Sequence, residues 1–166
     1  LFLEQINNGE TLTLTDDKMS RFLFTLEDAV DAVLESLTNT IGGEVFIPKI
    51  KSYTLPTCVK ALEQITGKKA DYKINGLRPG EKLHESMLDE TEINLSYEVT
   101  GTNLVCIKPQ YTKKDWDSVN YNKYTGPVYI SSNFIPSLQI SRCISGPALF
   151  FSSFGVCINF GVFCLW

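Results

Sequence analysis

The sequence contains few of the residues from which metal centres are built. Its 166 residues include one histidine, His84, and five cysteines, none of which forms a C-x-x-C pair. Structural zinc sites need clustered thiolates or imidazoles, so this spacing argues against a metal centre. The odd cysteine count argues against a disulfide framework and predicts reduced, mostly buried thiols in a cytoplasmic protein.

Glycine motifs that hold phosphates are also missing. Neither G-x-G-x-x-G nor G-x-x-x-x-G-K-[ST] occurs, and no G-x-S-x-G marks a nucleophile. The net charge of −4 lacks the basic field that nucleic acids attract, so no nucleic-acid partner is expected. The chain begins at Leu1, and LFLEQINNGE has no signal-peptide features, so we interpret the chain as a fragment or processed product.

Charged side chains disappear near the C-terminus. No charged residue occurs from Ile144 to Trp166, which is long enough to span a bilayer. However, the run is rich in Phe, Ser, Gly and Cys, contains Asn159, and has Arg142 as its flanking cation. Two interpretations stay open: a membrane segment, and a foreign or out-of-frame extension.

Strand-like and helix-like patterns alternate through the first half of the chain. The first helix has Thr25 as a candidate N-cap with Asp28 three residues on, and its apolar residues recur at helical spacing. Such alternation predicts an α/β layer structure. The expected elements are a strand at 11–16, a charged loop at 16–22, a helix at 25–37, a strand at 44–50, a helix at 54–69 ended by Gly67, a strand at 70–76, a helix beginning within 81–88, a hairpin at 97–109 turning near Gly101, and a loop at 111–127.

His84 lies in EKLHESML with no nucleophile pattern nearby. A packing or capping role on the expected helix is therefore favoured over a general-base role.

Arginine is scarce, and two arginines follow strand-like runs. The three are Arg21, Arg78 and Arg142. The planar arginine fork grips phosphate in a bidentate way, and ligands of α/β sheets bind beyond the carboxyl ends of strands. Arg21 and Arg78 are therefore expected to converge on one anion, while Glu81, across a Pro-Gly turn, can accept hydrogen bonds from ribose hydroxyls. A purely structural pairing of Arg78 with a nearby carboxylate stays open.

Three longer stretches occur in the order and spacing of one protein family: LTLTDDKMSRFLFTLEDAVDAVLESL, GGEVFIPKIKSYTL and NGLRPGEKLHESMLDE. Together they resemble the C-terminal half of the UDP-N-acetylglucosamine 4,6-dehydratases, the CapD-like polysaccharide-biosynthesis members of the extended short-chain dehydrogenase/reductase family. The resemblance is good over residues 1–109 and weak over 110–133, through YTGPVYISSN. Residues 134–166 diverge from the family as an apolar tail.

The resemblance implies the C-terminal part of a Rossmann-like extended short-chain dehydrogenase fold. The substrate-binding subdomain is expected to be present and the N-terminal cofactor half to be missing. By the same resemblance, Arg21 and Arg78 hold a nucleotide diphosphate and Glu81 contacts the ribose. Met19 and Ser20 are expected to line the same site.

His84 and Glu85 belong to the third stretch too, and their expected helical position suggests that they support the turn.

The residues that carry the family's chemistry are absent. Family members hold NAD(P) with G-x-x-G-x-x-G, and a Tyr-x-x-x-Lys pair starts hydride abstraction at the sugar C4 before water is eliminated across C5–C6. None of the seven tyrosines has a lysine four residues on, and the glycine pattern does not occur. This chain is therefore expected to bind no cofactor by itself, while NAD(P) is expected for the full-length protein.

These observations favour a UDP-N-acetylglucosamine-binding portion of a 4,6-dehydratase that acts in polysaccharide biosynthesis and is catalytically incomplete alone. The expected partner is a UDP-sugar, and the full-length protein is expected to be a homo-oligomer. Two alternatives remain: a non-catalytic product of a truncated gene, and a membrane-tethered binding module.

Overall fold

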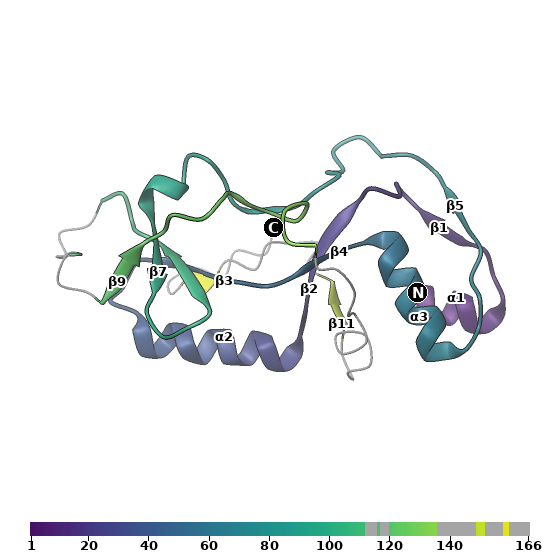
Figure 1. Ribbon diagram of the computed structural model, residues 1–166, viewed down its shortest axis with the longest axis horizontal. Helices are drawn as coiled ribbons and strands as arrows, with labels where there is room; N and C mark the ends of the chain where they lie inside the picture. Colours follow the sequence, from purple (N-terminus) through teal and green to yellow (C-terminus); the bar gives the residue numbers. More distant parts are fainter. Residues whose placement is uncertain (112–115, 117–119, 136–148, 152–157, 160–166) are drawn as a thin grey trace.

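The computed structural model describes residues 1–111, 116 and 120–135, and the backbone of residues 149–151 and 158–159. This part of the chain is elongated, with two helical ends joined by a middle region of strands (Figure 1). One end holds α1 (Phe2–Asn8), β1 (Leu12–Leu14), α3 (Leu55–Thr66) and β5 (Tyr72–Ile74). The middle holds β2 (Ser20–Thr25) and β4 (Ser52–Thr54). The other end holds α2 (Leu26–Asn39), β3 (Val45–Pro48), β7 (Ser96–Val99), β8 (Leu104–Ile107) and β9 (Tyr121–Lys123).

The strands of the described residues form four sheets. The largest has the order β12-β3-β8-β7-β9 and is antiparallel throughout, and a second, also antiparallel, has the order β11-β2-β4. β1 and β5 pair in parallel, with Leu12 opposite Tyr72. The other elements are β6 (Ser86–Leu88) paired antiparallel with β10 (Tyr129–Ile130), η1 (Ile93–Leu95), β11 (Leu149–Phe151) and β12 (Ile158–Asn159).

Three groups of buried side chains form the core. The group at the α1–α3 end includes Leu14, Tyr53 and Leu62, and the group under α2 includes Phe46. Between them, the middle group contains Phe22, whose ring stacks on Tyr129 with centroids 5.4 Å apart and planes 8° apart. This stack joins β2 to β10, which lie more than 100 positions apart in the sequence.

The two long helices begin where the sequence predicts. At the start of α2, the Asp28 amide donates to Thr25 Oγ1 at 3.1 Å, and the Thr25 amide donates to Asp28 Oδ2 at 3.0 Å. This reciprocal capping box satisfies amides that no helical carbonyl can reach. α3 begins after Thr54 and ends at Gly67, whose φ of 67° is the left-handed conformation that glycine adopts without strain.

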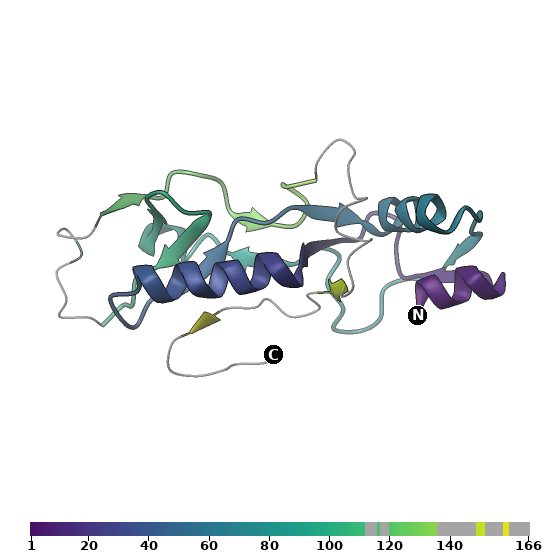
Figure 2. The same cartoon turned by 90° about the horizontal axis from the view of Figure 1, so that it is seen from below.

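The apolar stripe of α2 faces away from the core. α2 packs on the sheet through small residues, Ala32 and Ser36. Its long side chains lie on the outer side: α2 runs along the lower edge of the molecule in Figure 1 and faces the viewer in Figure 2, which is seen from below. At least a third of each of these apolar side chains is exposed: Leu26, Val30, Val33, Leu34 and Leu37.

Most predicted strands are confirmed, those at 11–16 and 44–50 as β1 and β3, and two other predictions are wrong. The 97–109 hairpin is confirmed, because β7 and β8 pair around Gly101, whose φ is 80°. The strand at 70–76 is confirmed as β5. The charged loop at 16–22 is wrong at its end, because β2 begins at Ser20. The helix within 81–88 is also wrong, because residues 86–88 form strand β6.

The loop predicted at 111–127 contains β9, and residues 112–115 and 117–119 lie outside the described part. No helix among the described residues is long and apolar enough to cross a membrane. The uncharged run 144–166 lies outside the described residues, except for the backbone of β11 and β12.

Candidate functional site

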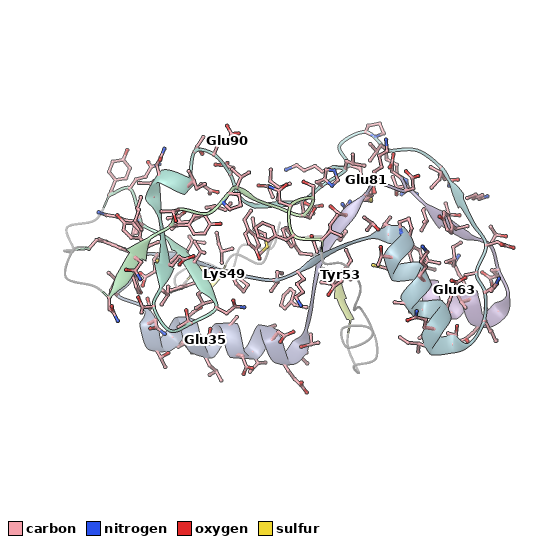
Figure 3. All side chains as sticks on the ribbon, in the orientation of Figure 1. Glu35, Lys49, Tyr53, Glu63, Glu81 and Glu90 are labelled. Carbon is pink, nitrogen blue, oxygen red and sulfur yellow. The ribbon has the colours of Figure 1, made fainter. Side chains whose placement is uncertain are left out.

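The RPGE sequence forms a tight exposed turn, which we call the Arg78–Glu81 turn. The Glu81 amide donates to the Arg78 carbonyl at 3.0 Å, and the Arg78 amide donates to Glu81 Oε2 at 3.2 Å. Gly80 has a φ of 85°, which an L side chain would strain. Figure 3 shows Glu81 on this turn, above β2 and between the two ends of the molecule. The turn therefore fixes a carboxylate three residues from an arginine.

The residues that lead into the turn are held by β1 and by Thr15 after it. The Asn75 amide donates to the Leu14 carbonyl at 2.9 Å, and the Gly76 amide donates to the Thr15 carbonyl at 3.0 Å. The Thr15 hydroxyl then reaches Glu81 Oε1 at 3.3 Å. Both carboxylate oxygens of Glu81 thus have a fixed partner, and each keeps a lone pair for a further donor.

The chain that leaves the turn is held by Arg21. Its Nη1 donates to the Ser20 carbonyl at 2.8 Å and to the Leu83 carbonyl at 3.2 Å, and its Nη2 donates to the Lys82 carbonyl at 3.0 Å. Its Nε lies 3.5 Å from Glu85 Oε1. The carbonyls just after the turn thus accept hydrogen bonds from a charged side chain of β2. These bonds stand in place of the helical hydrogen bonds that the sequence predicted for this segment.

A serine–histidine cluster lies behind the same segment. Ser20 Oγ is 2.7 Å from His84 Nδ1 and 2.7 Å from Ser131 Oγ. The Glu85 amide donates to Ser131 Oγ at 2.9 Å. Ser20 and Ser131 are fully buried, so neither hydroxyl can attack a substrate from this position. The cluster instead ties β2, the segment after the turn and the chain after β10 together.

The chain around β10 is fixed by a tyrosine. Burial raises the pKa of Tyr129, and the protonated hydroxyl donates to the Ile50 carbonyl at 2.6 Å. With the Phe22 stack, this bond sets the position of Ser131 two residues later.

The two arginines predicted for one anion site have different surroundings. Arg78 is exposed, and among the described residues its guanidinium has no hydrogen-bonding or ionic partner. The structural pairing of Arg78 with a carboxylate, which the sequence left open, is therefore not formed within this part of the chain. The side chain of Arg21 is 11% exposed and already engaged. Both arginines adjoin the same turn, one on it and one beneath the segment that follows it.

Met19 and Ser20 flank Arg21 from within. The Met19 side chain is 3% exposed and belongs to the core group that includes Leu14 and Tyr53. Ser20 is in the serine–histidine cluster. As the structure places them, both residues fix the backbone beside Arg21.

Thr15 and Ser131 were not predicted as site residues. Ser131 occurs in the YTGPVYISSN stretch, which was the one sequence signal that pointed to it. Its contact with Ser20 spans 111 positions, and no local pattern reports such a contact.

Chemically, the turn offers a free cation and an oriented carboxylate side by side. The cation suits phosphate, and the carboxylate suits neighbouring hydroxyl donors. No group of three or more metal-ligating side chains occurs within the part of the chain that the structure describes.

Comparison with known proteins matches this part of the chain to a family and to characterised enzymes. A family model described as "Polysaccharide biosynthesis protein" matches residues 1–106. The UDP-N-acetylglucosamine 4,6-dehydratase (inverting) of Campylobacter jejuni subsp. jejuni serotype O:2 is 37% identical over 121 residues, which are 72% of this chain and 35% of that protein. The UDP-glucose 4-epimerase of Rickettsia akari (strain Hartford) is 33% identical over 124 residues, or 75% of this chain and 34% of that protein.

The chain thus spans about a third of the length of these curated relatives. The X-ray structure of Pen from Bacillus thuringiensis superposes with a TM-score of 0.66 at 28% identity, covering 82% of this chain and 41% of that one. The resemblance drawn from the three sequence stretches is confirmed. The prediction of an α/β fold that forms one part of a larger Rossmann-like fold is confirmed as well.

Proposed function

The chain belongs to the polysaccharide biosynthesis protein family, and from this premise we propose that it is the UDP-sugar-binding portion of a longer nucleotide-sugar enzyme. The proposed ligand is UDP-N-acetylglucosamine, and the proposed reaction of the full-length enzyme is 4,6-dehydration. The chain itself would bind the nucleotide and leave the chemistry to residues that it lacks.

The observation that carries this proposal is the exposed guanidinium of Arg78, which has no partner among the described residues and lies on a turn that is held on both sides. The turn is anchored through Thr15 before it and through Arg21 after it. A cation on a fixed turn that forms no ion pair among the described residues is suited to an anionic ligand. In the proposed complex, Arg78 binds the diphosphate.

Glu81 and Arg21 have complementary roles in the proposed complex. The Glu81 carboxylate, oriented by the Thr15 hydroxyl and the Arg78 amide, would accept hydrogen bonds from the ribose hydroxyls. Arg21 would add positive charge near the diphosphate and one further N–H. Met19 and Ser20 would line the site through their backbone.

The relatives support the proposed nucleotide, UDP, more strongly than the proposed sugar of the ligand. The names of both enzyme groups contain UDP, whereas the sugar and the reaction differ between them. The identities are similar, 37% to the dehydratase and 33% or 38% to the epimerases, so 4-epimerisation is the second candidate reaction.

NAD(P), which the family resemblance implies for the full-length enzyme, does not fit the residues of this chain. A dinucleotide needs a glycine-rich turn and a free helix N-terminus for its pyrophosphate. At the start of α2, Thr25, Glu27 and Asp28 occupy that position, and two of them are acidic. At the start of α3, Thr54 caps the helix and Pro56 takes a position in the first turn. In the proposal, the cofactor belongs to another part of the full-length enzyme.

The test is calorimetric titration of the purified chain with UDP, UDP-N-acetylglucosamine and UDP-glucose. Replacing Arg78 by alanine removes a charged hydrogen bond and should weaken UDP binding by about 1.5–3 kcal/mol, or roughly tenfold to 150-fold. Lys60→Ala, which removes an exposed cation from α3, is the matched control and should leave the affinity unchanged.

Equal UDP affinity of the Arg78→Ala variant and the unaltered chain would overturn the site assignment. Absence of any UDP binding would favour a non-catalytic truncated gene product instead. The membrane-tethered alternative depends on residues outside the described part, and removal of 144–166 tests it by partitioning into detergent.

A further inference from the structure

The four residues after the Arg78–Glu81 turn, 82–85, are held by contacts from two distant parts of the chain. From β2, Arg21 binds the Lys82 carbonyl, and the Ser20 amide donates to the Leu83 carbonyl at 3.1 Å. From the chain after β10, Ser131 contacts Glu85. These contacts are continuous along the segment, and the segment is covalently joined to Glu81.

Ser131 is the centre of the second set of contacts. Its amide donates to the Glu85 carbonyl at 2.8 Å, and its hydroxyl accepts from the Glu85 amide at 2.9 Å. The same hydroxyl lies 2.7 Å from Ser20 Oγ and 3.2 Å from the Ser20 carbonyl, and the Ser131 carbonyl accepts from the Ser52 hydroxyl. The residue is fully buried, so water cannot replace these partners.

The donors and acceptors of this cluster can all be satisfied in one arrangement. An amide can only donate, so Ser131 Oγ accepts from Glu85 and has its own proton to give. If Ser131 donates to Ser20 Oγ, the Ser20 hydroxyl can donate to His84 Nδ1. The donors then run from the Glu85 amide through two serines to the histidine ring. A fully satisfied buried network of this kind favours a single geometry.

We propose that Ser131 and His84 are positioning residues for the nucleotide site. They act through residues 82–85 to set the Arg78–Glu81 turn. This inference rests on the proposed function, and it makes the segment after β10 a part of the site through its contacts with residues 82–85. The ligand class that depends on it is a nucleoside diphosphate, because the turn presents one cation beside one carboxylate.

The turn needs support on this side because its own contacts are few. Two hydrogen bonds close it internally, and Thr15 holds Glu81 from the entering side. Without the Ser131 hydroxyl, the leaving side would depend on Arg21, on backbone bonds of Ser20 and Ser131, and on the pairing of β6 with β10. Looser residues 82–85 would let the Glu81 carboxylate and the Arg78 side chain separate, which costs affinity for a ligand that must meet both.

The first experiment compares two adjacent serines. Ser131→Ala removes the buried hydroxyl, and Ser132→Ala removes an exposed hydroxyl that, among the described residues, contacts only its neighbour Asn133. We expect Ser131→Ala to weaken UDP binding by about fivefold to tenfold, the size of a coupling within one network. Ser132→Ala should bind UDP like the unaltered chain.

A double-mutant cycle separates positioning from a general loss of stability. In the Arg78→Ala background there is no Arg78 guanidinium left to hold beside the Glu81 carboxylate, so adding Ser131→Ala should weaken UDP binding by less than about twofold. A merely structural role would lower the affinity by the same factor in both backgrounds, and this result would overturn the proposal.

His84 gives a second, independent variant in case Ser131→Ala does not fold. His84→Ala should weaken UDP binding, whereas His84→Asn places a polar atom near the position of Nδ1 and should restore most of the affinity. Equal affinities of these two variants would contradict the role of the Ser20–His84 bond.

Hydrogen exchange of the amides at 76–85 provides a readout that needs no ligand. Faster exchange at 82–85 in Ser131→Ala than in Ser132→Ala is expected whether or not UDP binds. If UDP fails to bind the unaltered chain while this difference is present, the proposed function is wrong and the network is real. If UDP binds and Arg78→Ala weakens it while exchange at 82–85 is the same in both serine variants, the network inference is wrong and the site stands.

Discussion

The two arginines at the site should respond in opposite ways to the same substitution. Arg21→Met and Arg78→Met each remove one positive charge and keep most of the aliphatic stem. Arg21 donates to backbone carbonyls on two segments, whereas Arg78 is exposed without a partner among the described residues. We expect Arg21→Met to lower the free energy of unfolding and Arg78→Met to lower UDP affinity.

The magnitude follows from the bonds of Arg21. The bonds to Lys82 and Leu83 join distant segments, and a hydrogen bond to a charged group contributes about 1.5–3 kcal/mol. The Leu83 carbonyl keeps the Ser20 amide as a donor, and the exposed Lys82 carbonyl returns to water, so the lower part of the range applies. The sum is about 3–4 kcal/mol, to which the partly exposed Glu85 pair adds at most about 1 kcal/mol.

Urea unfolding followed by fluorescence of the native tryptophans measures both variants under the same conditions. The Arg78→Met variant should unfold within about 0.5 kcal/mol of the unaltered chain, as expected for an exposed side chain. A loss of less than about 0.5 kcal/mol in Arg21→Met would refute the argument that its guanidinium holds residues 82–85. A large loss in Arg78→Met would show that Arg78 has a structural partner.

Two further predictions concern the core and the outer face of α2. Burial, with a smaller contribution from Glu44, raises the pKa of the Cys106 thiol from 9.0 to about 12. At pH 8 its thiolate fraction should be roughly one in ten thousand, so mass spectrometry after iodoacetamide treatment should find Cys106 alkylated in urea and unmodified in buffer. Because this pKa is raised on folding, the contribution of Cys106 to the free energy of unfolding is complete below pH 9 and is lost as the pH rises towards 12. Alkylation in buffer at the rate seen in urea would contradict the burial of Cys106. Leu34 is 55% exposed, so Leu34→Ala should change the free energy of unfolding by less than about 0.5 kcal/mol. Leu62 on α3 is 6% exposed, so Leu62→Ala should cost about 2–5 kcal/mol in the same urea assay. Equal losses in the two variants would show that the α2 stripe is packed.

Those parts of the fold that depend on local chemistry were predictable from the sequence. Thr25 and Asp28 form their capping box within four residues, and Gly67 ends α3 because it can adopt a positive φ. The 97–109 hairpin turns at Gly101 for the same reason. In each case the decisive contacts lie within a few positions, so the sequence pattern contains them.

The segment EKLHESML was predicted wrongly because its contacts are distant. Its charges and apolar residues suit a helix by propensity, which is a weak preference that tertiary contacts override. Here the carbonyls of Lys82 and Leu83 bind Arg21, and both backbone groups of Glu85 bind Ser131. A peptide group that is bonded to another segment cannot also continue a helical ladder, so the segment ends in strand β6.

The outward apolar stripe of α2 shows a different limit of prediction from sequence. Helical spacing of Leu26, Val30 and Leu37 predicts which residues share a face, and it does not state which face the rest of the chain covers. The sheet side of α2 is formed by Ala32 and Ser36, whose small side chains allow close approach of the helix to β8. Periodicity therefore predicted the helix correctly without predicting its orientation.

Counting donors shows how the two arginines divide one site between them. The guanidinium of Arg21 has five N–H donors, and its contacts with three carbonyls and one carboxylate leave one on Nη2. In the proposed complex, a diphosphate would receive from Arg21 a single N–H and the effect of a partly buried charge, whereas the fork of Arg78 has no partner among the described residues. The planar fork suits peptide carbonyls as well as phosphate oxygens, which is why residue type alone pointed both arginines at the ligand. In the proposed complex, the bidentate contact therefore falls to Arg78, and its position depends on Arg21.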